Sequence, residues 1–500
     1  MDGNILTWPD ALIIIISFLA LLVLGPVFAK KTKTSQGYFL ADGQMPGWLV
    51  GFSMMATVVS SMTFLATPGF TYESDWRYMP THFTLLIAMV LALYVFMPFF
   101  RRGHVNSAYH YLEMRFGLWA RMYAAAGFIL FQIARAGIII YAVSLPFEVM
   151  TGLPIPWFII IMSCIVGFYS ISGGLKAILW ADTVQGILLI VGGLLCLPVI
   201  ISLLPGGFSE IISVARADGK MAVGTMSFTF YERGFWVMVL NHTFWYSHLM
   251  CADQQTVQRY MATSTEKKAK KSIVLSVAMT IPVWIYFTFI GTALYVFYKI
   301  IPNELVQEMA SEQVLPFFIL TQLPIGIRGL VIAGLGAAAM STLSSMVNAT
   351  AQTMTNDFYR RLINKNSEER HYLRAGRWFT FIFIIISLTA ALIIHWIRTD
   401  ALVNIQQMFI TILSGGLLGL FMLGFLTKRV DNKSAFIATA ITVVSVCFWL
   451  FAKSSWGLAI MPSVAEILPD DFSINVLSNI FIFGFGYFLS VLSRHKSKNR

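Results

Sequence analysis

Apolar residues follow one another in long runs along almost the whole chain, and short polar loops separate these runs. A run of about 20 apolar residues is long enough to cross the hydrocarbon core of a bilayer as a helix. The pattern therefore predicts an all-α polytopic membrane protein with about 13 transmembrane helices. The predicted spans are approximately 9–29, 46–72, 77–100, 118–149, 154–172, 176–204, 234–257, 272–300, 326–352, 375–397, 403–426, 434–452 and 473–493.

The first apolar run, about Ala11 to Ala29, is too long for the apolar core of a secretory signal peptide, so it predicts a retained helix. Lysine and arginine are concentrated in the loop after this run and in every second loop from there on. Because cytoplasmic loops carry such an excess, the N-terminus is expected outside and the C-terminus in the cytoplasm. The loops on the other side hold few lysines and arginines, and these include Arg77, Arg216 and Lys220. The basic loops carry Lys30/Lys31/Lys33, Arg101/Arg102/Arg115, Lys267/Lys268/Lys270/Lys271, Arg360/Arg361/Lys365/Arg370/Arg374, Lys428/Arg429/Lys433 and the tail Arg494–Arg500.

Composition supports the membrane assignment. Hydrophobic residues make up 57% of the 500 and charged residues 12%, with a net charge of +11, whereas soluble domains carry about 25% charged residues. The positive charge lies mostly in short loops, so it indicates membrane orientation rather than nucleic-acid binding. No P-loop of the Gly-x4-Gly-Lys-Ser/Thr kind is present, which argues against ATP-driven transport. The four cysteines lie in apolar segments without paired spacing and are expected to be buried free thiols.

The stretch Arg328–Asn348, RGLVIAGLGAAAMSTLSSMVN, combines small residues with two hydroxyl pairs, Ser341-Thr342 and Ser344-Ser345. On a helix, Ala338, Ser341, Ser345 and Asn348 share one face, which Ser344 and Thr342 flank. Hydroxyl and carbonyl oxygens in close approach suit a hard cation. The alternative is a helix–helix packing seam, for which small and hydroxyl residues are also typical.

Arg135 lies well over ten residues from either end of its predicted span. An arginine near the bilayer centre costs roughly 2.5–3.5 kcal/mol even on the mildest scale, so it must face protein or water. Its guanidinium can hold a substrate carboxylate in bidentate fashion. The alternatives are a structural ion pair and a side chain that reaches the interface, and the central position argues against the latter.

Asp182 also lies inside a predicted span, with Gln185 one turn further on. A buried carboxylate needs a cationic partner, either Lys176 on the same helix or a bound metal ion. The span 46–72 holds several hydroxyl residues and then Pro68-Gly69, a composition that favours a discontinuous helix whose freed backbone groups bind ions. An ordinary kinked helix is the alternative.

Seven stretches together resemble the sodium:solute symporter family, and most closely its bacterial sodium-coupled sialic acid symporters. The resemblance implies a LeuT-type fold, in which two inverted repeats of five spans form a core with one extra span before it and two after it. The repeats would occupy about 46–204 and 234–427, joined by an outer loop at 205–233, with broken helices at 46–72 and 234–257. The remaining parts would be 1–45 and 428–500. The matching text is YFLADGQMPGW, ATVVSSMTF, NSAYHYLEMRFG, GGLKAILWADTVQG, DQQTVQRYMATS, LPIGIRGLVIAGLGAAAMSTLSSMVNA and MTNDFYRRL.

Two sodium sites are implied by the resemblance. The first would use backbone carbonyls of the first broken helix and of the polar stretch, together with two hydroxyls. The second, described for the sialic acid branch, would use a carboxylate with three serines. The first set is Ala56, Val59, Ala338, Ser341 and Thr342; the second set is Asp182, Ser341, Ser344 and Ser345.

The resemblance also implies a substrate pocket, formed here by Ser60, Thr63, Tyr78, His82 and Arg135. Two positions depart from the sialic acid branch. Val58 stands where a threonine is expected, and His82 stands where the branch has a glutamine. These changes favour a retuned pocket for a sugar acid or another carboxylate. Further lining candidates on the second broken helix are Asn241, His242, Phe244 and Trp245.

The function expected from these residues is sodium-coupled import of a small, anionic organic solute such as sialic acid, without catalysis. A sodium/sugar, sodium/monocarboxylate or proton-coupled symporter remains the alternative within transporters. A channel would need rings of equivalent polar groups, and a sensor would usually carry an added signalling domain. The expected location is the bacterial inner membrane, and the expected form is a multi-pass monomer. Besides sodium and the solute, the lipid bilayer is the expected partner, and nucleic acid is not.

Overall fold

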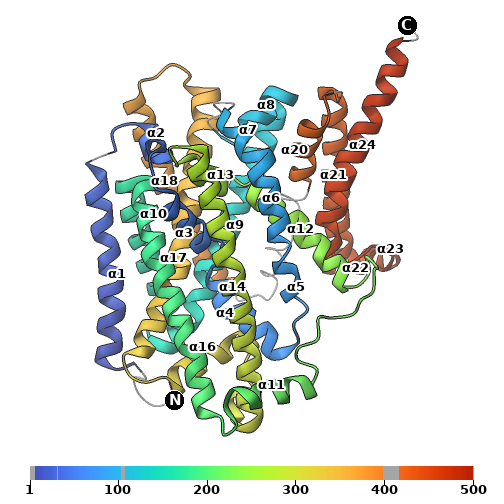
Figure 1. Ribbon diagram of the computed structural model, residues 1–500. Coiled ribbons are helices and arrows are strands. Elements are labelled where there is room, and N and C mark those ends of the chain that lie inside the picture. Colours follow the sequence, from blue (N-terminus) through green and yellow to red (C-terminus); the bar gives the residue numbers. More distant parts are fainter. Residues whose placement is uncertain (1–5, 31, 103–106, 398–415, 429, 499–500) are drawn as a thin grey trace.

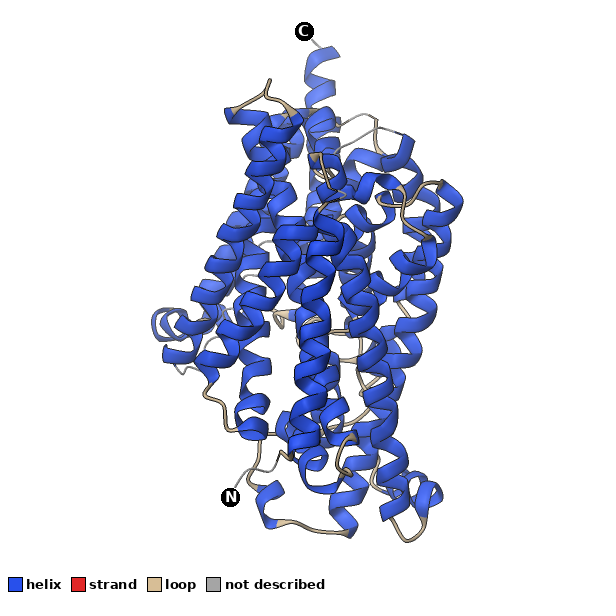
Figure 2. Ribbon diagram, turned by 90° about the vertical axis from the view of Figure 1, so that its left-hand side faces the viewer, coloured by secondary structure: helices blue, strands red, loops and turns tan. Residues whose placement is uncertain are grey.

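The computed structural model describes the chain except for residues 1–5, 31, 103–106, 398–415, 429 and 499–500. Helices supply its regular secondary structure, and they run mostly parallel to one long axis of the molecule (Figures 1 and 2). The elements are α1 Trp8–Ala29, α2 Ser35–Leu40, η1 Ala41–Gly43, α3 Gly47–Val58, α4 Ser61–Glu73, α5 Met79–His82, α6 Leu85–Leu91, η2 Ala92–Phe96, α7 Met97–Arg102, α8 His110–Phe116, α9 Leu118–Thr151, α10 Ile155–Leu203, α11 Gly207–Ala217, α12 Phe235–Cys251, α13 Gln254–Met261, α14 Glu266–Ile300, α15 Glu304–Gln307, α16 Ser311–Gln322, α17 Ile327–Thr353, η3 Met354–Ile363, α18 Glu369–Ile397, α20 Leu417–Leu426, α21 Asn432–Lys453, α22 Ser455–Ile460, α23 Pro462–Ile467 and α24 Phe472–Lys498.

Among the described residues, nine helices are long and apolar enough to cross a membrane, or ten if the bent pair α3 and α4 counts as one. The predicted spans 154–172 and 176–204 are two helices that meet at Gly174, whose φ of 60° and ψ of −154° are not helical; the two carry the single label α10. Much of the predicted span 403–426 lies outside the described residues. The total of about 13 spans therefore stays a prediction.

The first broken helix changes direction between α3 and α4, which are bent by 48°. The break lies at Val59 and Ser60, both of which have extended backbone. Ser60 caps α4, because its Oγ accepts the N–H of Met62 at 3.2 Å. The span 46–72 is discontinuous, as its composition predicted, but Pro68 and Gly69 lie inside α4 and not at the break. A helix tolerates proline when neighbouring groups satisfy the backbone carbonyl that proline leaves free.

The second broken helix is divided at Ala252 and Asp253, between α12 and α13. Asp253 caps α13 by accepting the N–H of Gln255 at 2.8 Å. Both breaks lie deep in the bundle, where they leave backbone groups outside regular helical pairing. Such groups are available to ions and polar solutes.

Helix α17, which carries the polar stretch, lies at the centre of the bundle. Nearly every one of its residues is buried, and it packs closely along α10 and also against α1, α9 and α18. A Cβ atom on Gly334 would lie 2.7 Å from the carbonyl oxygen of Leu188, so glycine permits this close approach of α10. The small residues of Arg328–Asn348 thus form a helix–helix packing seam, which was the alternative interpretation of this stretch. The hydrogen bonds of its hydroxyl groups are described with the functional site.

Helix α1 is fixed to the start of α17 by Asp10. Its carboxylate accepts the backbone N–H groups of Gly326 at 2.8 Å and Gly329 at 2.9 Å, and it pairs with Arg328 at 2.8 Å. A carboxylate at a helix N-terminus satisfies free N–H groups and opposes the helix dipole. The extra N-terminal helix is therefore anchored to the helix that carries the polar stretch.

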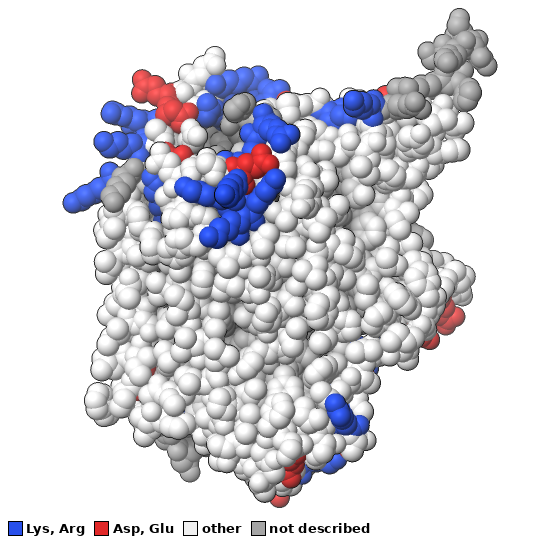
Figure 3. Space-filling model, in the orientation of Figure 1, with Lys and Arg blue, Asp and Glu red and all other residues white. Residues whose placement is uncertain are grey.

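Lysine and arginine gather at one end of the bundle, above α7, α8 and α13, whereas the opposite end shows few (Figure 3). We call the first of these the basic end; it includes Arg101, Lys267, Arg360, Arg361 and Lys365.

All four cysteines are free. Cys196 and Cys251 are buried as predicted, but Cys164 and Cys447 are exposed on the outside of the bundle.

Candidate functional site

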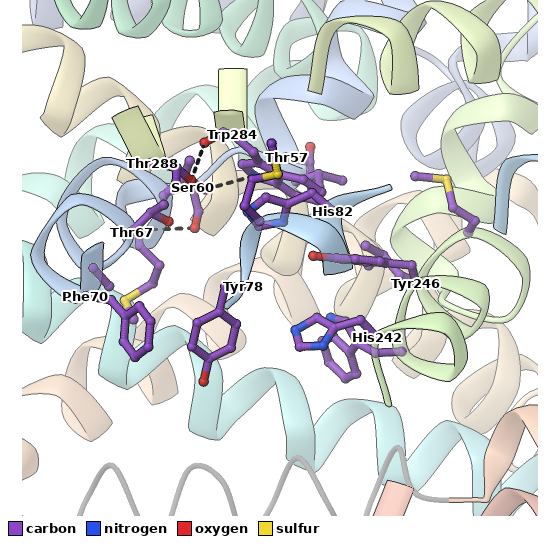
Figure 4. Close-up of a pocket in the computed structure, with 18 of the residues that line it drawn as sticks. Thr57, Ser60, Thr67, Phe70, Tyr78, His82, His242, Tyr246, Trp284 and Thr288 are labelled. Atoms are coloured by element: carbon purple, nitrogen blue, oxygen red, sulfur yellow. Dashed lines mark hydrogen bonds between the residues drawn. The ribbon is translucent and has the colours of Figure 1, made fainter. Parts of the chain in front are cut away.

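A cavity of about 490 Å³ lies between the two broken helices. It reaches from the break in α3 and α4 towards the end opposite the basic end, where Thr71, Asp75 and Trp76 line it. Both aromatic and polar side chains line its walls, and Tyr78, His242 and Tyr246 face a common space with His82 (Figure 4). A concave site with aromatic walls and a few polar groups is typical of small-molecule binding.

All five residues predicted to hold the substrate line this cavity: Ser60, Thr63, Tyr78, His82 and Arg135. Thr63 accepts a hydrogen bond from the indole of Trp284 at 3.3 Å. Trp284 also lies beside the His82 ring, with 4.7 Å between ring centroids. Both ring nitrogens of His82 are buried and have no hydrogen-bond partner in the described part of the chain. Neither nitrogen is therefore committed to another described residue.

Arg135 presents its guanidinium to the cavity from the middle of α9. Its Cζ lies 5.9 Å from the centroid of the Phe131 ring. Asp253 attracts Arg135 from a distance, but no salt bridge or hydrogen bond to the Arg135 guanidinium occurs within the described ranges. The internal ion pair considered from the sequence is thus not formed with any described residue, and an anionic solute would be the first close partner of this cation.

The residues predicted for the first sodium ion come together beside the break in the first broken helix. Ser341 donates its hydroxyl to the carbonyl oxygen of Ala56 at 2.8 Å and to that of Ala338 at 3.2 Å. Thr342 donates to the same Ala338 carbonyl at 3.1 Å. Val59 is the residue at which α3 ends. Carbonyl and hydroxyl oxygens from two helices thus converge here, which is the donor type that Na⁺ takes.

The residues predicted for the second sodium ion also lie close together, around the Asp182 carboxylate. Ser53 donates to Asp182 at 2.5 Å and Ser344 donates to it at 3.3 Å. The strongest partner is Arg259, whose Nη2 lies 3.0 Å from Asp182 and also bonds Ser345. Lys176 was one predicted partner of Asp182, and this is wrong: it lies at the edge of the bundle and pairs with Asp42 at 2.6 Å.

Arg259 was missed because the predicted span ended at residue 257, which placed it in a loop. In the structure it lies on α13 and is only 1% exposed. The signal available in the sequence was the text DQQTVQRYM, in which an arginine follows a polar cap at helical spacing. Arg259 and Gln255 line the substrate cavity as well, so α13 contributes to both parts of the site.

Two of the further candidates on α12, His242 and Trp245, line the cavity, whereas Asn241 and Phe244 do not. Asn241 accepts a hydrogen bond from Asn475 at 3.1 Å, which directs it towards α24. Phe244 packs in the neighbouring hydrophobic cluster.

Comparison with known proteins shows the family of this chain. The model of the sodium:solute symporter family matches residues 38–442. The chain is 32% identical to the sodium/sialic acid symporter of Proteus mirabilis over 431 residues, which is 85% of this chain and 86% of the relative. It is 30% identical to that of Aliivibrio fischeri, over 88% and 86% of the two chains. A solved outward-open, substrate-bound sodium-coupled sialic acid symporter superimposes with a TM-score of 0.90 at 29% identity, covering 97% of this chain and 98% of that one.

The broken helices and the solved neighbours show the predicted LeuT-type fold, and the family match makes the chain a sodium-coupled secondary transporter. The chain belongs to the sodium:solute symporter family.

Proposed function

We propose that this symporter imports an acidic sugar of the sialic acid type by alternating access. The guanidinium of Arg135, which has no hydrogen-bond or ion-pair partner among the described residues, carries the proposal, because a buried cation inside a solute cavity calls for a carboxylate. Ser60 and Thr63 add hydroxyls for the carboxylate, and His82 and the aromatic walls contact the sugar body. The volume of about 490 Å³ suits a solute larger than a simple monocarboxylate. The similarity to sialic acid symporters supports the same substrate class.

Sodium is the driving ion in this proposal. The first ion binds Ala56, Val59, Ala338, Ser341 and Thr342, and so joins the first broken helix to α17. The second binds Asp182, Ser341, Ser344 and Ser345, where it competes with the Arg259 guanidinium. Each sodium ion that moves down a membrane potential of 100 mV releases about 2.3 kcal/mol, so two ions give about twice that for concentrating the solute.

The orientation proposed is N-terminus outside and C-terminus in the cytoplasm, with the basic end facing the cytoplasm. The cavity then reaches outward, and the basic end is closed by bonds between helices. Arg101 on α7 donates to the carbonyls of Tyr260 and Thr263 at 3.2 and 3.1 Å. Arg121 on α9 pairs with Asp357 on η3 at 2.7 Å. In this outward-facing state the solute enters from outside, and inward opening requires these bonds to separate. We place the two repeats at about 46–204 and 234–427.

In this function the protein moves its solute without changing a covalent bond. The test measures the unfolding temperature of the purified protein with sialic acids, other sugar acids, monocarboxylates and neutral sugars, in sodium and in potassium. The result expected is stabilisation by sialic or related sugar acids in sodium but not in potassium. Stabilisation by neutral sugars alone would contradict the role of Arg135, and stabilisation that follows pH instead of sodium would indicate proton coupling.

A further inference from the structure

A second cavity, of about 280 Å³, lies at the basic end and shares no lining residue with the substrate cavity. It is formed where α8, α9, η3 and the segment after η3 meet. No carboxylate belongs to its lining among the described residues. Its lining consists of His110, Arg121, Asn356, Arg360, Arg361 and Lys365.

Two carboxylates behind this lining fix the direction of its guanidinium groups. Glu113 accepts Arg121 Nη1 at 2.6 Å and Arg361 Nε at 2.8 Å. Asp357 accepts Arg121 Nε at 2.7 Å. Burial acts to raise the pKa of Glu113, but the hydrogen bonds from Arg361 and Arg121 outweigh it and lower this pKa to about 2. Glu113 is therefore ionised at every physiological pH, and it holds the arginines in place.

Several donors of the lining are not used by these carboxylates. Within the described ranges, no hydrogen bond reaches Nη1 of Arg361, Nε or Nη2 of Arg360, or the ammonium of Lys365. The Nδ1 atom of His110 is buried and has no partner there either. Arg360 is held by Glu369 at 3.2 Å and lies over the Tyr372 ring. Positioned cations with unused donors around a hollow are the arrangement that binds a multivalent oxyanion.

We propose that this cavity binds a phosphate monoester through Arg360, Arg361 and Lys365. A phosphate group offers three acceptor oxygens and a charge between −1.5 and −2 at neutral pH, which matches convergent arginine and lysine donors better than a single carboxylate does. The volume holds a phosphate with a small attached group. The phosphate comes either from a lipid headgroup of the adjacent leaflet or from a free metabolite.

The position of the cavity gives such binding a consequence. Arg360 and Arg361 lie on η3, which continues directly from α17, the helix of the proposed sodium ligands. Arg121 lies on α9, which carries Arg135. An anion in the cavity strengthens the closed arrangement of η3 against α9 and α8, so it stabilises the outward-facing state and slows uptake. This consequence rests on the proposed function, whereas the binding itself does not.

Binding is tested on the purified full chain without sodium or solute, with inorganic phosphate as the probe and chloride at matched ionic strength as the reference. A bound ligand raises the midpoint of thermal unfolding in a saturable manner. The variant Arg360→Gln/Lys365→Gln removes two cavity cations that are exposed enough to leave the fold intact. The matched control is Lys267→Gln/Lys271→Gln, which removes two exposed lysines from the same end, outside the cavity.

The expected result is saturable stabilisation of the wild type and the control, with at least tenfold weaker phosphate binding to the cavity variant. Equal binding to both variants, or no saturable binding to the wild type, overturns the proposal. Phosphatidylcholine vesicles with and without phosphatidic acid, whose headgroup is a phosphate monoester, then distinguish the sources. If sodium-driven uptake is slower in the vesicles that contain the lipid, the lipid headgroup supplies the bound phosphate. If uptake is slower when phosphate is added on the side of the basic end, a free phosphate metabolite supplies it. Because phosphate binding is measured without sodium or solute, its failure is distinguishable from failure of the transport proposal.

Discussion

The guanidinium of Arg259 lies 3.0 Å from the carboxylate of Asp182, and both side chains are sealed from solvent. Ser53 and Ser345, which hydrogen-bond this pair, come from two further helices. The arginine thus occupies the same oxygen cluster that is proposed for the second sodium ion. If the proposed second site is right, an internal cation and a transported cation compete for the Asp182 carboxylate.

Replacing Arg259 with glutamine should make the protein depend more strongly on sodium. Removing one partner of a buried ion pair costs about 3–5 kcal/mol, because the other charge is left without compensation. In Arg259→Gln, sodium becomes the only cation available to Asp182. The unfolding temperature without sodium should fall, and the rise on adding sodium should exceed that of the wild type. The double variant Asp182→Asn/Arg259→Gln should lose this additional rise. A sodium response equal to that of the wild type would contradict competition at this carboxylate.

This pair also shows what the sequence can and cannot determine. The apolar runs predict the helices to within a few residues, as in α17 and α9, because a span must be long and apolar to cross the bilayer. The partner of Asp182 is 77 residues away on another helix, and no local pattern encodes that contact. Lys176 was the nearer cation in sequence, but its side chain faces Asp42.

The first broken helix shows a second limit. Pro68-Gly69 is the most conspicuous interruption in that span, yet α4 continues through it. The chain breaks at Ser60, where a hydroxyl caps the following helix. Ser60 was the informative signal for the position of the break, because an N-cap hydroxyl accepts a hydrogen bond from a backbone N–H group that the start of a helix leaves without a partner. Ser60 and Thr63, which the sequence suggested for the substrate pocket, both line the cavity.

Substituting Asp182 by asparagine should distinguish the contributions of the two proposed sodium ions to transport. Asparagine keeps the size of the side chain but removes the charge that would hold the second sodium. The Hill coefficient of sodium-dependent uptake is expected to fall toward one, while part of the transport remains through the first site. Uptake into proteoliposomes at a series of sodium concentrations measures this. A coefficient unaltered by the substitution would argue for a single coupled ion.

Ser341→Ala should abolish sodium-dependent uptake. Ser341 is the hydroxyl shared by both proposed ions, and its hydrogen bond to the carbonyl oxygen of Ala56 joins the first broken helix to α17. Loss of its oxygen removes a ligand from each site. Ser163→Ala is the matched control, because it removes a buried hydroxyl from α10 outside both clusters. Sodium-driven uptake that persists in Ser341→Ala at the wild-type rate would refute the assignment of the first site.

Arg135→Lys should weaken binding of an acidic sugar by about tenfold or more, equivalent to about 1.4 kcal/mol. A lysine keeps the charge but cannot offer the planar, bidentate fork that a carboxylate takes from arginine. The affinity is measured by titrating the solute in saturating sodium. Sodium binding alone should be unaltered in this variant, which separates a substrate role from a folding defect. Full retention of affinity would exclude a direct contact between Arg135 and the carboxylate.

Glu113 should make the basic end sensitive to acid. Its pKa of about 2 in the folded protein is lower than the ordinary value of 4.5, because the hydrogen bonds from Arg361 and Arg121 outweigh burial. A carboxylate with a lowered pKa contributes stability that is complete above its ordinary value and is lost progressively as the pH falls towards the lower one. Other carboxylates titrate in the same range, so the informative quantity is the difference between the wild type and Glu113→Gln. The wild type should lose more thermal stability between pH 5 and pH 3 than the variant does, because only the wild type has this carboxylate to protonate. Parallel pH profiles for the two proteins would show that Glu113 does not hold Arg121 and Arg361 in the folded state.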